Sequence, residues 1–228
     1  MDNPQDPQDR ILDAALAHVP FDGWSEQTLK RAASDADIPL PEARALFPRG
    51  AVDLALAFHR RGDERMLRRV RQESMADLSY SDKVARAIWL RLDSVDKEAA
   101  RRATTLFALP NHAADGMRAL WGTADAIWSA LGDKSNDGNW YSKRATLTGV
   151  YGSVVLFWLG DASLDHADTK AFIARRISDV MRFERMKSSV SANPVGRVVM
   201  AGPNFLMSRL RAPIRPPRGF PGTTGTRP

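Results

Sequence analysis

The chain has 228 residues, no cysteine and a formal net charge of +6 at pH 7. This length allows one large domain or two small ones with a hydrophobic core. Without cysteine there is no disulfide framework, thiolate metal site or cysteine nucleophile. The positive charge lies at the C-terminal end, because residues 188–228 hold six arginines and no acidic residue, whereas residues 1–47 hold nine acidic and four basic residues.

The first 50 residues have the pattern of a small helical head. Residues 1–9 are acidic and contain proline, which predicts a disordered N-terminus and differs from a signal or mitochondrial transit peptide. Helices are predicted from about residue 9 to Pro20, from an N-cap at Ser25 to about residue 35, and over residues 42–47. A long fourth helix is predicted over residues 51–78. This order is that of the helix-turn-helix-like head of TetR-type proteins, here residues 10–50.

The charge of this head argues against nucleic acid as a partner. Its third helix, the one that enters the major groove in such a head, carries only one cation, Arg44. Phosphate contacts from several cations supply most of the affinity of a protein for DNA. We therefore expect no nucleic-acid binding, and a TetR-type transcriptional regulator with a hydrophobic effector is the alternative function.

Residues 51–187 are predicted to form a larger helical body. Further helices are expected to begin at a cap at Ser81, at Asp93 or Ser94, and at Asn111, and the last firm helix covers residues 164–187. The helix after Asn111 is amphipathic, with apolar residues at helical spacing: Met117, Leu120, Trp121, Ala124, Ile127, Trp128 and Leu131. No alternating strand pattern persists along the chain, so the predicted fold class is all-α.

Residues 139–160 form the stretch around which the body is organised. They are apolar on nearly every side but too short, and too often interrupted by Gly149, Gly152 and Ser153, to span a bilayer. A helix of this kind is expected to be buried on all sides. So wide an apolar surface, broken by glycines, predicts a lipid-sized cavity, which the spacing assigns to Trp121, Trp128, Val150, Tyr151, Val154, Trp158 and Ile177.

The sequence lacks the motifs of the common enzyme classes. Its four histidines form no His-Glu-x-x-His or Glu-x-x-His pair, and no phosphate-binding loop or nucleophile elbow is present. We therefore predict a binding protein with no catalytic residues, no metal and no cofactor. A helical enzyme with a polar cluster in its cavity is the third alternative.

Composition suggests two sites on the surface, one for a partner protein and one for a membrane. Trp140 and Tyr141 follow a polar loop, and Arg144 lies one turn further on, which is the composition of an interface hot spot. The alternative is that Trp140 packs the helix start onto the preceding helix. In residues 188–228, apolar residues alternate with arginines, which suits an anionic membrane surface or else a flexible tail. The membrane contacts assigned here are Val198, Val199, Phe205, Leu206, Arg209, Leu210 and Arg211.

Three segments resemble one known family, the accessory lipid-binding proteins of ubiquinone biosynthesis known as the ninth Coq protein. They are residues 14–25 (AALAHVPFDGWS), residues 120–145 with Leu120-Trp121, Asn139-Trp140-Tyr141 and Arg144-Ala145, and residues 168–181 with Asp168-Thr169 and Asp179-Val180-Met181. The resemblance covers about residues 10–187. The Gly202-Pro203 step departs from the family, whose last amphipathic helix binds membrane.

The resemblance implies a TetR-like fold without DNA binding and a non-enzymatic role. The ligand would be an isoprenoid quinone precursor or a phospholipid, presented to the demethoxyubiquinone hydroxylase. The hydroxylase-binding patch of the family corresponds here to Trp140, Tyr141 and Arg144. We expect a cytoplasmic protein bound peripherally to the inner membrane, and the sequence leaves open whether it forms a homodimer.

Overall fold

In the computed structural model, residues 6–133 and 138–192 are described, and they are largely helical with no strand. This confirms the all-α class. The α helices are α1 (Pro7–Asp22), α2 (Glu26–Asp35), α3 (Leu40–Leu46), α4 (Ala51–Gln72), α5 (Tyr80–Leu92), α6 (Lys97–Phe107), α7 (Ala113–Ala130), α8 (Gly138–Gly160) and α9 (Ala167–Ala192), with a short 3-10 helix, η1 (Leu164–His166), before the last.

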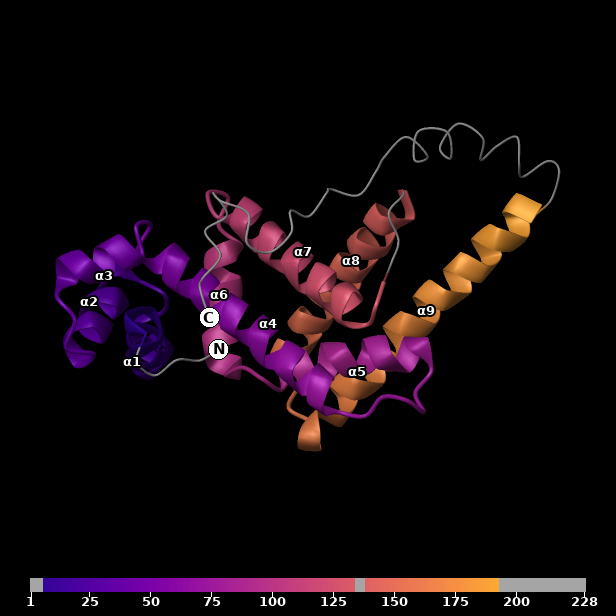
Figure 1. The fold of residues 1–228 in the computed structure, drawn as a ribbon, viewed down its shortest axis with the longest axis horizontal. Helices are drawn as coiled ribbons and strands as arrows, with labels where there is room; N and C mark the ends of the chain where they lie inside the picture. The colour runs from indigo at the N-terminus through magenta and orange to yellow at the C-terminus, as the bar shows by residue number, and fades with distance from the viewer. Residues whose placement is uncertain (1–5, 134–137, 193–228) are drawn as a thin grey trace.

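Helices α1 to α3 form a head at one end of the molecule, and α4 leads from it into the body (Figure 1). The head core combines buried side chains of α1 and α2 with Phe58 of α4, and Trp24 closes it by donating a hydrogen bond to the Ala99 carbonyl of α6 at 3.0 Å. Arg44, the single cation of α3, is bound to Glu26 at 2.7 Å. The one arginine that α3 could offer to a phosphate backbone is therefore already paired.

The N-terminal boundaries differ from those predicted. The side chain of Asp6 accepts a hydrogen bond from the Gln8 amide at 3.0 Å, so α1 begins at Pro7 and residues 6–9 are ordered rather than disordered. Pro20 does not end α1, because it lies in the last turn, where its missing N–H removes only one ladder bond. The helix ends at Gly23, whose φ of 64° is favoured by glycine.

Three other helix ends are shifted. The long helix predicted to reach residue 78 ends at Gln72, and Ser79 rather than Ser81 caps α5 by accepting from the Asp82 amide at 3.2 Å. The predicted last helix is divided into η1 and α9, because Asp165 and His166, which belong to η1, adopt φ values of 52° and 54°. Helix α9 then continues to residue 192, beyond the predicted end at 187. Residues 193–228, with all the predicted membrane contacts, lie outside the described residues.

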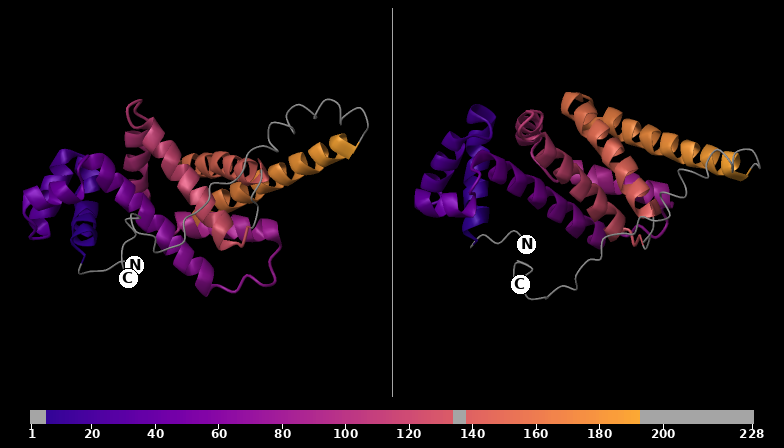
Figure 2. Two further views of the ribbon diagram at one scale, coloured as in Figure 1. Left: turned by 45° about the horizontal axis from the view of Figure 1, so that its top comes forward. Right: turned by 90° about the horizontal axis from the view of Figure 1, so that it is seen from above.

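In the body, α8 packs between α7 and α9, while α7 also packs on α4 and α9 on α5 (Figure 2). Its core joins Met66, Ile88 and Ile127 to the inward face of α8. Burial of α8 on all sides was predicted and is wrong: Leu156 is 64% exposed and Phe157 36%, because the packing helices leave one side of α8 open. In the two described ranges, no helix is both long enough and apolar enough to cross a bilayer.

Candidate functional site

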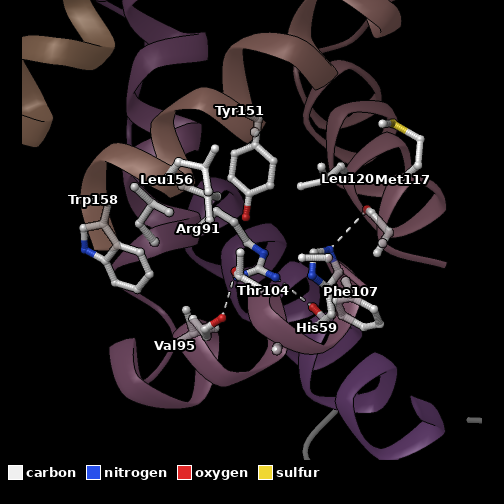
Figure 3. Close-up of a pocket in the computed structure, with 18 of the residues that line it drawn as sticks. His59, Arg91, Val95, Thr104, Phe107, Met117, Leu120, Tyr151, Leu156 and Trp158 are labelled. Carbon is white, nitrogen blue, oxygen red and sulfur yellow. Dashed lines mark hydrogen bonds between the residues drawn. The ribbon is translucent and has the colours of Figure 1, made fainter. Parts of the chain in front are cut away.

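A cavity of about 360 Å³ lies in the body between α4, α5, α6, α7 and α8 (Figure 3). Four of its lining residues are exposed, and the two with large side chains, Met117 at 60% and Leu156 at 64%, mark its open rim. The walls are apolar. The lining residues are Phe58, His59, Arg91, Leu92, Val95, Ala100, Ala103, Thr104, Phe107, Ala108, Ala113, Gly116, Met117, Ala119, Leu120, Tyr151, Gly152, Val155, Leu156 and Trp158.

The floor of this cavity is a buried ion pair. Arg91 of α5 is 3% exposed, and its Nε donates to Asp63 Oδ1 of α4 at 2.6 Å. Its Nη2 donates to the backbone carbonyl of His59 at 3.0 Å. Gly62 leaves the space for this guanidinium, since a Cβ there would lie 2.5 Å from it. The cationic head of Arg91 is thus held by α4 beneath an apolar cavity.

Thr123 of α7 links this pair to two further polar side chains. Its hydroxyl donates to Asp63 Oδ1 at 2.8 Å, and His59 Nε2 lies 2.9 Å from the same hydroxyl. Since that hydroxyl already donates to Asp63, we assign the His59 proton to Nε2. The Tyr151 side chain also interacts with Thr123, and its hydroxyl points toward Arg91 (Figure 3).

Burial keeps His59 and Tyr151 uncharged. It lowers the pKa of His59 to about 4, with a further contribution from the positive charge of Arg91. It also raises the pKa of Tyr151 to about 12. At neutral pH the only full charges of the network are therefore those of Arg91 and Asp63, which compensate each other.

The buried histidine should make the protein sensitive to acid. Its pKa is about 4 in the folded protein against 6.5 ordinarily, so between these values the unfolded chain binds more protons. The free energy of unfolding should fall by roughly 3 kcal/mol as the pH falls through this window. In urea denaturation at pH 7 and pH 4.5, His59→Gln should lose part of this dependence. Equal pH dependence of the variant and the wild type would contradict the assignment.

A second, smaller cavity of about 250 Å³ lies on the other side of α8. It is bounded by α5, α7, α8 and α9, with Lys143 at its edge held to Asp133 at 2.8 Å. Its lining residues are Tyr80, Ser81, Val84, Trp128, Ser142, Lys143, Thr146, Leu147, Val150, Ile177, Val180 and Met181.

The seven residues predicted to line one lipid cavity are not brought together by the structure. Tyr151 and Trp158 line the larger cavity, whereas Trp128, Val150 and Ile177 line the smaller one. The remaining two, Val154 and Trp121, line neither: Val154 is fully buried in the core, and Trp121 packs 6.2 Å from the Trp140 ring. Helical spacing indicated which side chains point inward, but α8 separates the two spaces.

The predicted surface hot spot is buried. Arg144 is 1% exposed and Trp140 9%, and the guanidinium lies 4.0 Å from the centre of the Trp140 ring. Arg144 also binds Asp125 of α7 at 2.5 Å and Asp133 at 3.0 Å. Tyr141 is half-buried, with its ring edge-on to Trp140 at 4.8 Å. The alternative, in which Trp140 packs the start of α8 onto α7, describes this arrangement.

The polar floor was missed by the sequence analysis, although a signal existed. His59 and Asp63 are spaced i, i+4 on α4, and Arg91 stands alone within an apolar segment of α5. A lone cation inside an apolar helix indicates a buried partner. Among the described residues, no group of His, Asp or Glu side chains is arranged to hold a metal ion.

Comparisons with known proteins point to one family. The family model described as COQ9 matches residues 113–184, from α7 into α9. The chain is 32% identical over 205 residues to ubiquinone biosynthesis protein COQ9-B, mitochondrial, of Xenopus laevis, which covers 86% of this chain and 69% of that protein. It is 29% identical over 195 residues to the Homo sapiens protein COQ9, mitochondrial, covering 81% of this chain and 61% of that protein.

The fold is similar to a solved structure of a different kind of protein. The TetR transcriptional regulator from Nitrosomonas europaea ATCC 19718 superposes with a TM-score of 0.61 at 24% identity, covering 76% of this chain and 97% of that chain. This likeness confirms the TetR-like architecture. The chain spans 63% of the length of the Xenopus tropicalis COQ9 protein, to which it is 31% identical. The level and extent of these identities show that the chain belongs to the COQ9 family.

Proposed function

We propose that the chain is a non-enzymatic lipid-binding protein of ubiquinone biosynthesis. This process appears in the names of its relatives. Its ligand is an isoprenoid quinone precursor, held in the cavity between α4 and α8. The observation that supports this most is a cavity of about 360 Å³ with apolar walls and a compensated polar floor. Apolar cavities with a few polar groups are typical of small-molecule sites.

The proposal extends to a partner and a location. The lipid is presented to the demethoxyubiquinone hydroxylase, and the protein works at the surface of the membrane that holds its ligand. The open rim supports this, because Met117 and Leu156 place exposed apolar side chains at the mouth of the cavity. A phospholipid occupying the same cavity is the other ligand to be tested.

Native mass spectrometry of the purified protein tests the ligand. One bound isoprenoid lipid per chain is expected, and it should be lost on organic extraction. In cells lacking the gene, ubiquinone should fall and demethoxyubiquinone should accumulate, and the wild-type chain should reverse both. Protein that carries no lipid, together with unchanged quinone content in such cells, would exclude the proposed function.

A further inference from the structure

The side of the molecule on which the larger cavity opens also carries the most exposed apolar side chains. Resting on the proposed function, we propose that this side, formed by the end of α1, by α6 and by the α8–α9 turn, docks on a lipid surface. Phe21 and Leu164 enter the apolar layer of that surface, and the cavity mouth at Met117 and Leu156 faces it. We call these four side chains and the exposed side of α6 the docking face.

Helix α6 lies at the centre of the docking face, between the head and α8 (Figure 2). On one flank, Arg102 of α6 donates to the Pro20 carbonyl in the last turn of α1 at 2.8 Å. On the other flank, Arg101 donates to the Leu159 carbonyl near the end of α8 at 2.7 Å. These two bonds hold the last turn of α1 and the last turn of α8 on either side of the exposed part of α6.

Each of the two segments beside α6 presents one large apolar side chain to solvent. Phe21 follows Pro20 in α1, and Leu164 begins η1 after α8 has ended. Each is 85% exposed, more than any other large apolar side chain among the described residues. The turn before Leu164 is held by Asp161, which accepts from the Thr169 amide at 3.0 Å, so its position is fixed by the fold.

The cavity mouth extends the docking face. Leu156 lies one turn before Leu159, the residue that Arg101 binds, and it is 64% exposed. Met117 of α7, at 60%, and Ala108 at the end of α6 line the same cavity. Single exposed apolar residues are ordinary on a protein surface, whereas several on one side mark an interaction site.

The charged side chains of α6 suit lipid headgroups. Arg101 and Arg102 are 48% and 43% exposed in their side chains, and both pair with Glu98, so this part of the surface has two cations for one acid. Long basic side chains can reach headgroup phosphates while apolar neighbours enter the acyl layer. The excess of positive charge is small, so apolar contact should supply most of the affinity.

The apolar cavity favours a lipid surface over a protein as the occupant of this face. A ligand with a long apolar tail that left the mouth into water would lose roughly 0.8 kcal/mol for each CH₂ group exposed. A mouth pressed onto a membrane avoids this cost, because the tail passes from one apolar environment to another. Phe21 and Leu164 line neither cavity, so their exposure serves contact with the membrane rather than with the ligand.

Vesicle flotation of the full-length protein tests the docking face. The vesicles are phosphatidylcholine with and without phosphatidylglycerol, and the wild type should bind both. The double variant Phe21→Ser, Leu164→Ser removes two apolar side chains and should partition at least about tenfold more weakly into both kinds of vesicle. Because both residues are exposed, its melting temperature and its bound lipid, measured by native mass spectrometry, should not change.

Leu78 provides a matched control, since it is exposed at 37% but lies between α4 and α5, and Leu78→Ser should bind vesicles like the wild type. Equal flotation of the double variant and the wild type would overturn the docking face. So would wild-type binding that requires phosphatidylglycerol, because the arginines of residues 188–228 would then account for it.

The two proposals fail in different ways. Wild type that carries lipid but binds no vesicle would overturn the docking face and leave the lipid-binding function intact, and this face would then fit a protein partner. Wild type that carries no lipid would overturn both. If the double variant does not fold, the single variants Phe21→Ser and Leu164→Ser decide, each with binding expected to be about threefold weaker.

Discussion

Replacing Arg144 by methionine should lower the free energy of unfolding by about 3–5 kcal/mol. Arg144 is 1% exposed, and its guanidinium is held by Asp125 at 2.5 Å and Asp133 at 3.0 Å. Without Arg144, the buried carboxylate of Asp133 loses one cationic partner and keeps Lys143. Urea denaturation followed by circular dichroism measures the change.

The control for this variant is an arginine that also pairs with an aspartate but is exposed to solvent. Arg182 is 74% exposed in its side chain and pairs with Asp179 at 2.5 Å, so Arg182→Met should change the unfolding free energy by less than about 1 kcal/mol. Equal stability of Arg144→Met and the wild type would mean that the buried network contributes nothing. If a change at Arg144 or Trp140 reduces hydroxylase binding, the free energy of unfolding of the same variant has to be measured, because unfolding alone would reduce binding.

Replacing Gly152 by leucine should abolish lipid binding in a folded protein. Gly152 lines the larger cavity, and a Cβ there would meet only Leu120 Cδ1 at 3.5 Å, an ordinary contact. The backbone therefore accepts the new side chain, which fills the space that the ligand needs. We expect the affinity for ubiquinone-2 to fall at least about 100-fold, equivalent to roughly 3 kcal/mol, in a binding titration.

Gly149 provides the control on the same helix. It is exposed, lines neither cavity, and has nothing within 4 Å of its Cβ position. Leucine is favoured over glycine within a helix, so both substitutions should stabilise α8 by a similar amount, up to about 1 kcal/mol. Gly149→Leu should bind ubiquinone-2 like the wild type, and equal binding by Gly152→Leu would move the ligand away from the larger cavity.

The fold was accessible from the sequence because helices and their ends leave local signals. Residues 139–160 were predicted as the central helix and α8 spans Gly138–Gly160, while the Ser25 cap is confirmed by its hydrogen bond to the Thr28 amide at 3.1 Å. The helix ends that were predicted wrongly depend on where the residue lies in its helix and on the surrounding structure. Pro20 fits within α1 because it stands in the final turn. Asp165 and His166 interrupt the last helix with positive φ values, which Asp and His adopt more often than most residues but still only in a minority of cases.

The site was accessible only in part, because it depends on which helices meet. Spacing identified Tyr151 and Trp158 as inward-facing but gave no sign that α8 separates them from Val150 and Ile177. Composition suggested an exposed Trp140 and Arg144, whereas the acids that bury Arg144 lie 11 and 19 residues away. A cation next to an aromatic residue has the same sequence pattern whether it faces solvent or an acidic neighbour.

The location of the bound lipid is the central claim, and photocrosslinking tests it most directly. A ubiquinone analogue with a diazirine on its second isoprene unit is bound to the full-length protein, irradiated and mapped by peptide mass spectrometry. We predict labelling at Met117 or Leu156, at the rim of the larger cavity, or at Leu120, which also lines it. Labelling confined to Tyr80 and Met181 of the smaller cavity, or to residues 193–228, would contradict the account.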